Sequence, residues 1–199
     1  WKLIKRFSED IDVVIDRESL GFGDHDLSNK RQKKLIKKCS AHIHQELLPT
    51  LRKRFETLLS PESKWALEPA GVDEDPDQQT LLFAYPGVLN HTTSYLRPVV
   101  KLEMGARSDT EPSQDVPIRP YLCEAFPDQL SDGRFEVKTV VARRTFWDKV
   151  MLLHEETFRP VERPRKRPVA RHYYDLWCLI QAGVADQAIA DPGLFARVA

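Results

Sequence analysis

The stretch that decides the fold is RFSEDIDVVID at residues 6–16, in which polar and β-branched residues alternate. Alternation of this kind is typical of a half-buried strand whose polar face borders a cleft. The acidic face holds Asp10, Asp12 and Asp16, and the apolar face holds Ile11, Val13 and Ile15. An acidic pair on a strand offers oxygen ligands to Mg²⁺ together with substrate phosphates. The alternative is that Asp-x-Asp is only a solvated pair at a strand end.

Composition narrows the classes of protein to consider. The 199 residues carry 30 basic and 30 acidic side chains, so only local charge segregation would favour a charged partner. The sequence has no run of about eighteen apolar residues, which predicts no membrane partner. The three cysteines, Cys39, Cys123 and Cys178, form no Cys-x-x-Cys, which favours a cytoplasmic setting and argues against a zinc cluster. The first residue is Trp1 rather than Met, which predicts a piece of a longer protein.

A long amphipathic helix is predicted from residue 29 to about residue 59, because apolar residues recur there at spacings of three and four. Pro49 is expected to kink or divide this helix. Its opening turns are basic, although the helix dipole favours acidic residues at an N-terminus. The basic residues are Lys30, Arg31, Lys33, Lys34, Lys37 and Lys38. They indicate either an anionic partner or a solvated basic face.

Further strands are predicted at 65–68, 80–85, 99–107 and 135–141, with a polar loop at 108–117. In the 99–107 strand, alternation places Lys101, Glu103 and Arg107 on one face. If this strand pairs beside the first strand, Glu103 becomes a third carboxylate facing Asp10 and Asp12. Three such acids can hold two metal ions for phosphoryl chemistry. The alternative is that Lys101 and Glu103 form a charge pair.

Two later helices carry isolated charges among apolar neighbours. Lys149, on a helix at 144–154, either points into a pocket or extends its ammonium to water. Asp175, on a helix at 171–180, needs a cationic partner, and Lys149 or Arg171 would supply one. The segment 159–171 between them has six basic residues and one acid, which suits phosphate or RNA contacts or an exposed loop without a ligand.

Four motifs follow one another over most of the chain: RFSEDID at 6–12, Lys101-Leu102-Glu103, Thr145-Phe146-x-x-Lys149 and Arg171-x-x-Tyr174-Asp175-Leu176. Together they resemble the AbiEii/AbiGii toxin family, within the DNA polymerase β-like nucleotidyltransferase superfamily. The resemblance implies a catalytic set in which the first three residues hold Mg²⁺: Asp10, Asp12, Glu103, Lys149 and Asp175. Substrate contacts are expected from Arg6, Ser8, Lys101, Arg107 and Arg171.

The resemblance further implies the toxin half of a toxin–antitoxin or abortive-infection pair. An NTP would be the donor, tRNA or another nucleic acid the acceptor, and a separate antitoxin protein the cognate partner. Family members carry a Gly-Gly-Ser/Thr turn before the Asp-x-Asp strand, and this sequence begins after that point. The chain is then either a fragment of a complete enzyme or a remnant that binds nucleotide or RNA without transfer. A metal-dependent glycosyltransferase is a third reading, and the later lysine and aspartate motifs count against it.

The predicted fold is α+β, with a mixed-sheet nucleotidyltransferase core, a long flanking helix and a helical C-terminal part. The five predicted strands are assigned to one mixed sheet. The predicted domains are residues 1–142 for the core and 143–199 for the helical part.

Overall fold

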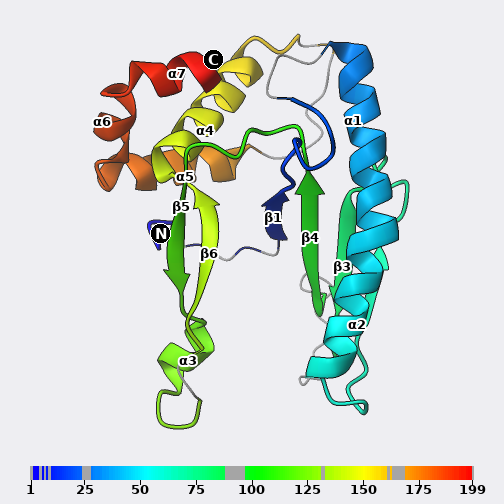
Figure 1. The fold of residues 1–199 in the computed structure, drawn as a ribbon. Helices are drawn as coiled ribbons and strands as arrows, with labels where there is room; N and C mark the ends of the chain where they lie inside the picture. The colour runs from blue at the N-terminus through cyan, green and yellow to red at the C-terminus, as the bar shows by residue number, and fades with distance from the viewer. Residues whose placement is uncertain are drawn as a thin grey trace. The chain divides into compact units, whose positions relative to one another are not determined.

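The computed structural model describes residues 2–4, 6, 8, 10–23, 28–87, 97–130, 133–160, 162 and 169–198. The chain divides into two compact units, which we describe separately. The sheet unit comprises residues 7–110, and the hairpin–helix unit comprises residues 1–6 and 111–199. Figure 1 labels the elements of both units.

The sheet unit contains a four-stranded mixed sheet in the order β1-β4-β3-β2. Its strands are β1 (Asp10–Val14), β2 (Ala66–Pro69), β3 (Thr80–Ala84) and β4 (Val99–Gly105). β1 runs parallel to β4, whereas β3 is antiparallel to both β4 and β2. The predicted α+β class is therefore confirmed, and the first strand does pair beside the 99–107 strand, which the sequence analysis had treated as a condition.

The predicted long helix lies in the sheet unit and is divided just before Pro49. It consists of α1 (Asn29–His42), a π-helical turn η1 (Ile43–Leu47) and α2 (Leu48–Leu58). Proline has no backbone N–H to donate to the preceding turn, which accounts for the break in the regular ladder at this point. The buried face of α1 contributes Leu35 and Cys39 to a core that also contains Leu67 of β2 and Leu81 of β3.

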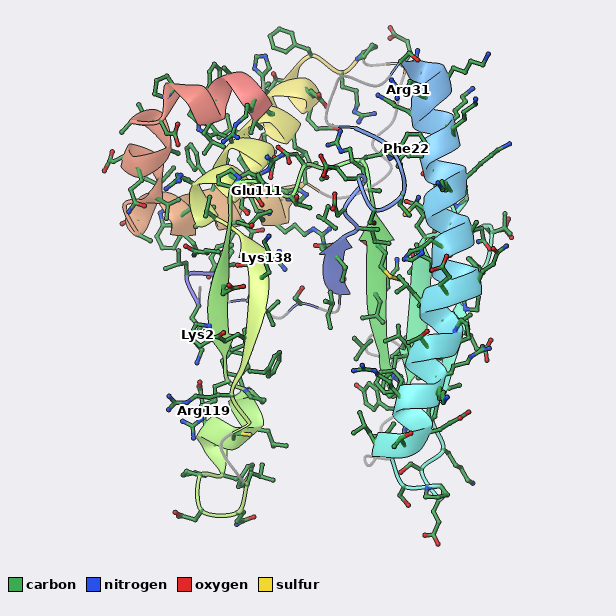
Figure 2. The ribbon with its side chains drawn as sticks, in the orientation of Figure 1. Lys2, Phe22, Arg31, Glu111, Arg119 and Lys138 are labelled. Atoms are coloured by element: carbon green, nitrogen blue, oxygen red, sulfur yellow. The ribbon has the colours of Figure 1, made fainter. Side chains whose placement is uncertain are left out.

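The hairpin–helix unit begins with the antiparallel strands β5 (Ser113–Ile118) and β6 (Phe135–Val140), with α3 (Tyr121–Ala125) between them. Figure 2 labels Glu111 and Lys138, whose side chains form an ion pair at 3.6 Å on this hairpin. The helices that follow are α4 (Ala142–Thr157), α5 (Ala170–Gln181), α6 (Val184–Ile189) and α7 (Pro192–Val198). Their shared core consists of Phe146, Leu179, Val184 and Ala188.

Two strand predictions were wrong in detail. The strand predicted at 135–141 belongs to the separate β5–β6 sheet. β5 (Ser113–Ile118) begins inside the loop predicted at 108–117 and ends one residue beyond it. β5 carries Asp115 and Pro117 and lies in a two-stranded ribbon, so its sequence lacks the apolar alternation of a covered strand.

The apolar side of β1 is more exposed than a half-buried strand would be. Ile11 is 51% and Val13 is 41% exposed, although Ile15 just beyond the strand is buried. β1 is an edge strand, and the core cluster of the sheet unit contains residues of β2, β3 and β4 but none of β1. The alternation in the sequence therefore identified the two faces of β1 without revealing that its apolar face is largely uncovered.

The division between compact units falls between residues 110 and 111, earlier than the predicted domain boundary at 142/143. The β5–β6 pairing continues to the start of α4, where the backbone N–H of Val141 donates to the carbonyl of Pro112 at 3.0 Å. The guanidinium of Arg144 also donates to the carbonyl of Glu111. Within the described part of the chain, no helix combines the length and the apolar character needed to cross a membrane.

The buried face of α1 makes a first prediction about stability. Leu35 is fully buried, whereas Leu58 of α2 is 76% exposed. Leu35→Ala should lower the free energy of unfolding by about 3 kcal/mol, because it removes buried methyl groups and leaves a cavity. Leu58→Ala should change it by less than about 0.5 kcal/mol. Urea denaturation of both variants checks this, and equal losses would contradict the assigned core.

Candidate functional site

The acidic residues of β1 and β4 are aligned by backbone pairing. In the parallel register, Asp12 lies opposite Glu103 and Asp10 lies opposite Lys101. Partners in adjacent strands point to the same face, and so do residues two apart on one strand. Asp10, Asp12 and Glu103 therefore share one face of the sheet. The other face of β4 contributes Met104 to the core with α1.

Lys101 lies within this acidic group. Its Nζ is 2.9 Å from Oε1 of Glu103 and 3.6 Å from Oε1 of Glu74, in the loop between β2 and β3. The two readings that the sequence left open are therefore both realised, because Glu103 is on the face of Asp10 and Asp12 and is also paired with Lys101. The lysine offsets part of the repulsion between neighbouring carboxylates.

The donor set suits a hard divalent cation that shares its ligands with a substrate. Among the described residues, no group of three or more histidine, cysteine, aspartate or glutamate side chains forms a ready-made metal centre. Mg²⁺ is usually held by one or two carboxylates, with waters and substrate phosphates supplying the other ligands. Asp10 and Asp12 would provide those carboxylates, and the register places Glu103 opposite Asp12 as a further oxygen donor.

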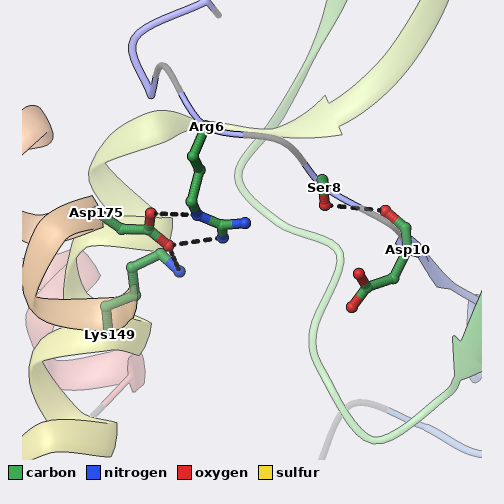
Figure 3. Close-up of polar contacts among 5 residues, drawn as sticks. All are labelled: Arg6, Ser8, Asp10, Lys149 and Asp175. Carbon is green, nitrogen blue, oxygen red and sulfur yellow. Dashed lines mark hydrogen bonds and ion pairs between the residues drawn. The ribbon is translucent and has the colours of Figure 1, made fainter. Parts of the chain in front are cut away.

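Two other predicted substrate contacts lie in the sheet unit. Arg107, two residues beyond the end of β4, forms an ion pair at 2.6 Å with Asp77 of the β2–β3 loop. The hydroxyl of Ser8 donates to the backbone carbonyl of Asp10 at 3.2 Å (Figure 3). The acidic loop 73–77 thus supplies carboxylates to both Lys101 and Arg107.

A second polar cluster lies in the hairpin–helix unit around Asp175 of α5. Asp175 is fully buried, and Arg6 binds both of its carboxylate oxygens (Figure 3). Nε of Arg6 donates to Oδ1 at 2.7 Å, and its terminal nitrogen donates to Oδ2 at 2.9 Å. Nζ of Lys149, from α4, lies 2.9 Å from the same Oδ2. One buried carboxylate therefore holds two cations.

The ionisation of Asp175 follows from these contacts. Burial alone raises the pKa of a carboxyl group, but hydrogen bonds and charge from Arg6 and Lys149 outweigh it and lower the pKa of Asp175 to about 2. The pKa of the neighbouring His172 is also lowered, first by burial and then by the charges of Lys149 and Arg171, and this favours the neutral imidazole. The cluster therefore combines an ionised aspartate with a neutral histidine near pH 7.

The sequence analysis found part of this cluster. It expected a cation from Lys149 or Arg171 beside Asp175, and the structure places Lys149 there while Arg171 is exposed. It missed Arg6 as the bidentate partner, because 169 residues separate the pair and no local pattern connects them. Most of the basic segment 159–171 lies outside the described residues, and Arg159 at its start pairs with Glu156.

The structure thus brings the predicted site residues together in two groups. The sheet unit holds Asp10, Asp12, Lys101 and Glu103 on one face, with Ser8 and Arg107 nearby in the chain. The hairpin–helix unit holds Arg6, Lys149 and Asp175 in direct contact, with Arg171 on the same helix as Asp175.

The buried cluster makes a prediction with a pH signature. Asp175→Asn should lower the free energy of unfolding at pH 7 by about 3 kcal/mol, because Arg6 and Lys149 lose their shared counter-charge. The pKa of Asp175 is depressed from 3.8 to about 2, so its contribution is full above about pH 4 and is lost as the pH falls towards 2. Denaturant unfolding of wild type and variant at pH 7, 4 and 2 should show the difference shrinking at the acid end.

Arg171→Gln is the matched control on the same helix, because Arg171 is exposed. It should change stability by less than about 0.5 kcal/mol at each pH. A stability difference for Asp175→Asn that stays constant between pH 7 and 2 would contradict an ionised, cation-bound Asp175.

Comparison with known proteins identifies the family. The family model described as "Nucleotidyl transferase AbiEii toxin, Type IV TA system" matches residues 1–198. No curated protein and no solved structure matches the chain. The family match covers both the acidic strands and the Asp175 cluster, and it agrees with the resemblance carried by the four motifs. The chain therefore belongs to the AbiEii nucleotidyl transferase toxin family of type IV toxin–antitoxin systems.

Proposed function

We propose that this chain is a Mg²⁺-dependent nucleotidyltransferase that moves a nucleotide from an NTP to an acceptor and releases pyrophosphate. The observation that carries the proposal is the parallel register of β1 and β4, which sets Asp12 opposite Glu103 and puts Asp10 on the same face. Like charges placed opposite one another weaken a sheet, so a pair of carboxylates in this arrangement favours a functional role.

Each acidic residue has a defined task in this proposal. Asp10 and Asp12 hold the metal, and Glu103 completes the acidic group. Bound Mg²⁺ supplies charge neutralisation at the triphosphate and a lowered pKa at the acceptor oxygen. Lys101 lies between Glu74 and Glu103, where it limits repulsion among the acids and presents an N–H donor on the same face. Ser8 and Arg107 are the remaining predicted substrate contacts in this unit.

Lys149 and Asp175 have linked roles. Lys149 stabilises the negative charge that develops on the transferred phosphate. Asp175 is a positioning residue, and the 2.9 Å contact with Nζ supports this because it fixes the end of a flexible lysine side chain. Arg6 donates to both oxygens of the same carboxylate, which restricts the rotation of the Asp175 side chain. Arg6 and Arg171 are also predicted to contact substrate.

The family and the basic segments suggest the biological setting. The acceptor is tRNA or another nucleic acid, and the protein acts in the cytoplasm as the toxin whose effect a cognate antitoxin protein counters. The type IV toxin–antitoxin description of the family supports the antitoxin partner.

A non-catalytic nucleotide-binding role is the second candidate. It is favoured by the ion pair between Lys101 and Glu103, which engages an oxygen that a metal would otherwise use. In this alternative the acidic face binds Mg²⁺ and nucleotide without transfer.

The transferase proposal is tested by following each labelled NTP into total tRNA in the presence of Mg²⁺. Asp10→Asn combined with Asp12→Asn should lower transfer by about 100-fold or more, because the carboxylates that hold the metal are lost. Asp115→Asn, on exposed β5, is the matched control and should retain activity. Absence of transfer by the wild type, with Mg²⁺-dependent nucleotide binding intact, would favour the non-catalytic alternative.

The role of Lys149 is tested separately. Lys149→Gln should lower kcat by about 10-fold or more while the KM for NTP changes little, because the lysine acts on charge that develops during transfer. Lys138→Gln is the control, since Lys138 is an exposed lysine in the same unit. An equal effect of both substitutions, or an effect on KM alone, would contradict the assignment.

A further inference from the structure

The first three turns of α1 form a basic face. The residues of this basic face are Lys30, Arg31, Lys33, Lys34, Lys37 and Lys38, and all six are exposed. The sequence contains no acidic residue from Ser28 to Gln45. Within the described chain, no carboxylate forms an ion pair with any of the six, whereas Arg52, Lys101 and Arg107 of the same unit are each paired with a carboxylate. Figure 2 labels Arg31 in the first turn of α1.

The opposite side of the helix fixes how this face is presented. Leu35 and Cys39 on α1 and Ile43 in the π-helical turn are fully buried in the core of the sheet unit. The helix is therefore held by its apolar side, and the lysines lie on the side directed to solvent. A rigid helix that presents repeated cations loses little order when it binds an extended anion.

The charge arrangement opposes helix stability. Lys30 and Lys34, and likewise Lys33 and Lys37, are like charges one turn apart, which repel each other on a helix surface. The positive end of the helix dipole adds to this repulsion. Packing of the apolar side is what keeps this segment helical. Local conflicts of this kind concentrate at functional surfaces.

We propose that the basic face of α1 binds the phosphate backbone of a nucleic acid. Its cations recur about every 5.4 Å, one helical turn, so several of them can face phosphates along one strand. The contact is to phosphates and carries no base specificity. The inference rests on the proposed function in one respect: it makes this surface the place where the nucleic-acid acceptor is held.

A nucleic acid fits this face better than a membrane does. Helices that lie on membranes insert an apolar face into the lipid boundary. The apolar side of α1 is occupied by the protein core, and the six exposed residues are all charged.

The test uses the full chain and a matched pair of double variants. Lys34→Gln with Lys37→Gln removes two charges from the basic face. Lys53→Gln with Arg54→Gln removes two exposed charges from α2. The probes are a labelled RNA duplex, the DNA duplex of the same sequence, and vesicles of phosphatidylserine and phosphatidylcholine. Affinity is measured by anisotropy or sedimentation from about 50 to 200 mM salt, and circular dichroism verifies that each variant is folded.

The α1 variant should bind nucleic acid about tenfold or more weakly at low salt, with the slope of log affinity against log salt reduced by roughly 1.5. The α2 variant should bind as the wild type does. Equal loss in both variants, no nucleic-acid binding by the wild type, or binding to vesicles alone would overturn the inference. Comparison of RNA with DNA then identifies which backbone is preferred.

RNA binding measured without Mg²⁺ and NTP separates this inference from the transferase proposal. Under these conditions the wild type should still bind RNA, because contacts between the basic face and phosphates need neither metal nor nucleotide. Selective RNA binding without transfer to any acceptor would refute the transferase proposal and leave the basic face established. Transfer that persists without α1-dependent binding would refute only the basic face.

Discussion

The parallel pairing of β1 with β4 is the constraint on which the account of the acidic site depends. β1 is an edge strand with an exposed apolar face, so its backbone hydrogen bonds to β4, rather than packing, determine where its side chains lie. The ladder continues past the strand, where the N–H of Ile15 donates to the carbonyl of Gly105 at 2.8 Å. A shift of one residue in this register would move Asp10 and Asp12 to the opposite face from Glu103. The chemistry proposed for the sheet unit therefore depends on main-chain geometry.

The Asp175 cluster is governed by a different constraint, the free-energy cost of burying a charged carboxylate. A buried carboxylate is costly unless it is paired, and here Arg6 and Lys149 both pair with it. The segment containing Arg6 belongs to the hairpin–helix unit, and only four residues later the chain enters β1 of the sheet unit at Asp10. Arg6, which binds Asp175, is therefore close in sequence to Asp10 and Asp12.

The sequence predicted those features whose signal is local. Period-two alternation identified the common face of Lys101 and Glu103, and period 3.6 identified α1 and its basic turns. The need of a buried charge for a partner predicted either Lys149 or Arg171 beside Asp175, and Lys149 is the one in contact. The contribution of Arg6 was not predicted, because a contact across 169 residues leaves no periodic trace. The pairing of β5 with β6 was missed for a related reason. A solvent-exposed two-stranded ribbon needs no alternation of apolar residues, so the sequence of β5 resembles a loop and β6 was predicted without its partner.

The most direct test of the account is to locate the bound metal by paramagnetic broadening in NMR spectra. Mn²⁺ would be titrated with a non-hydrolysable NTP analogue into isotopically labelled protein. The account predicts that the backbone amide signals of residues 10–12 and 101–103 broaden first in the sheet unit, and that Asp12→Asn abolishes this broadening. Broadening centred on the acidic loop 73–77, or unchanged in the Asp12→Asn variant, would contradict a metal–nucleotide site on the face shared by β1 and β4.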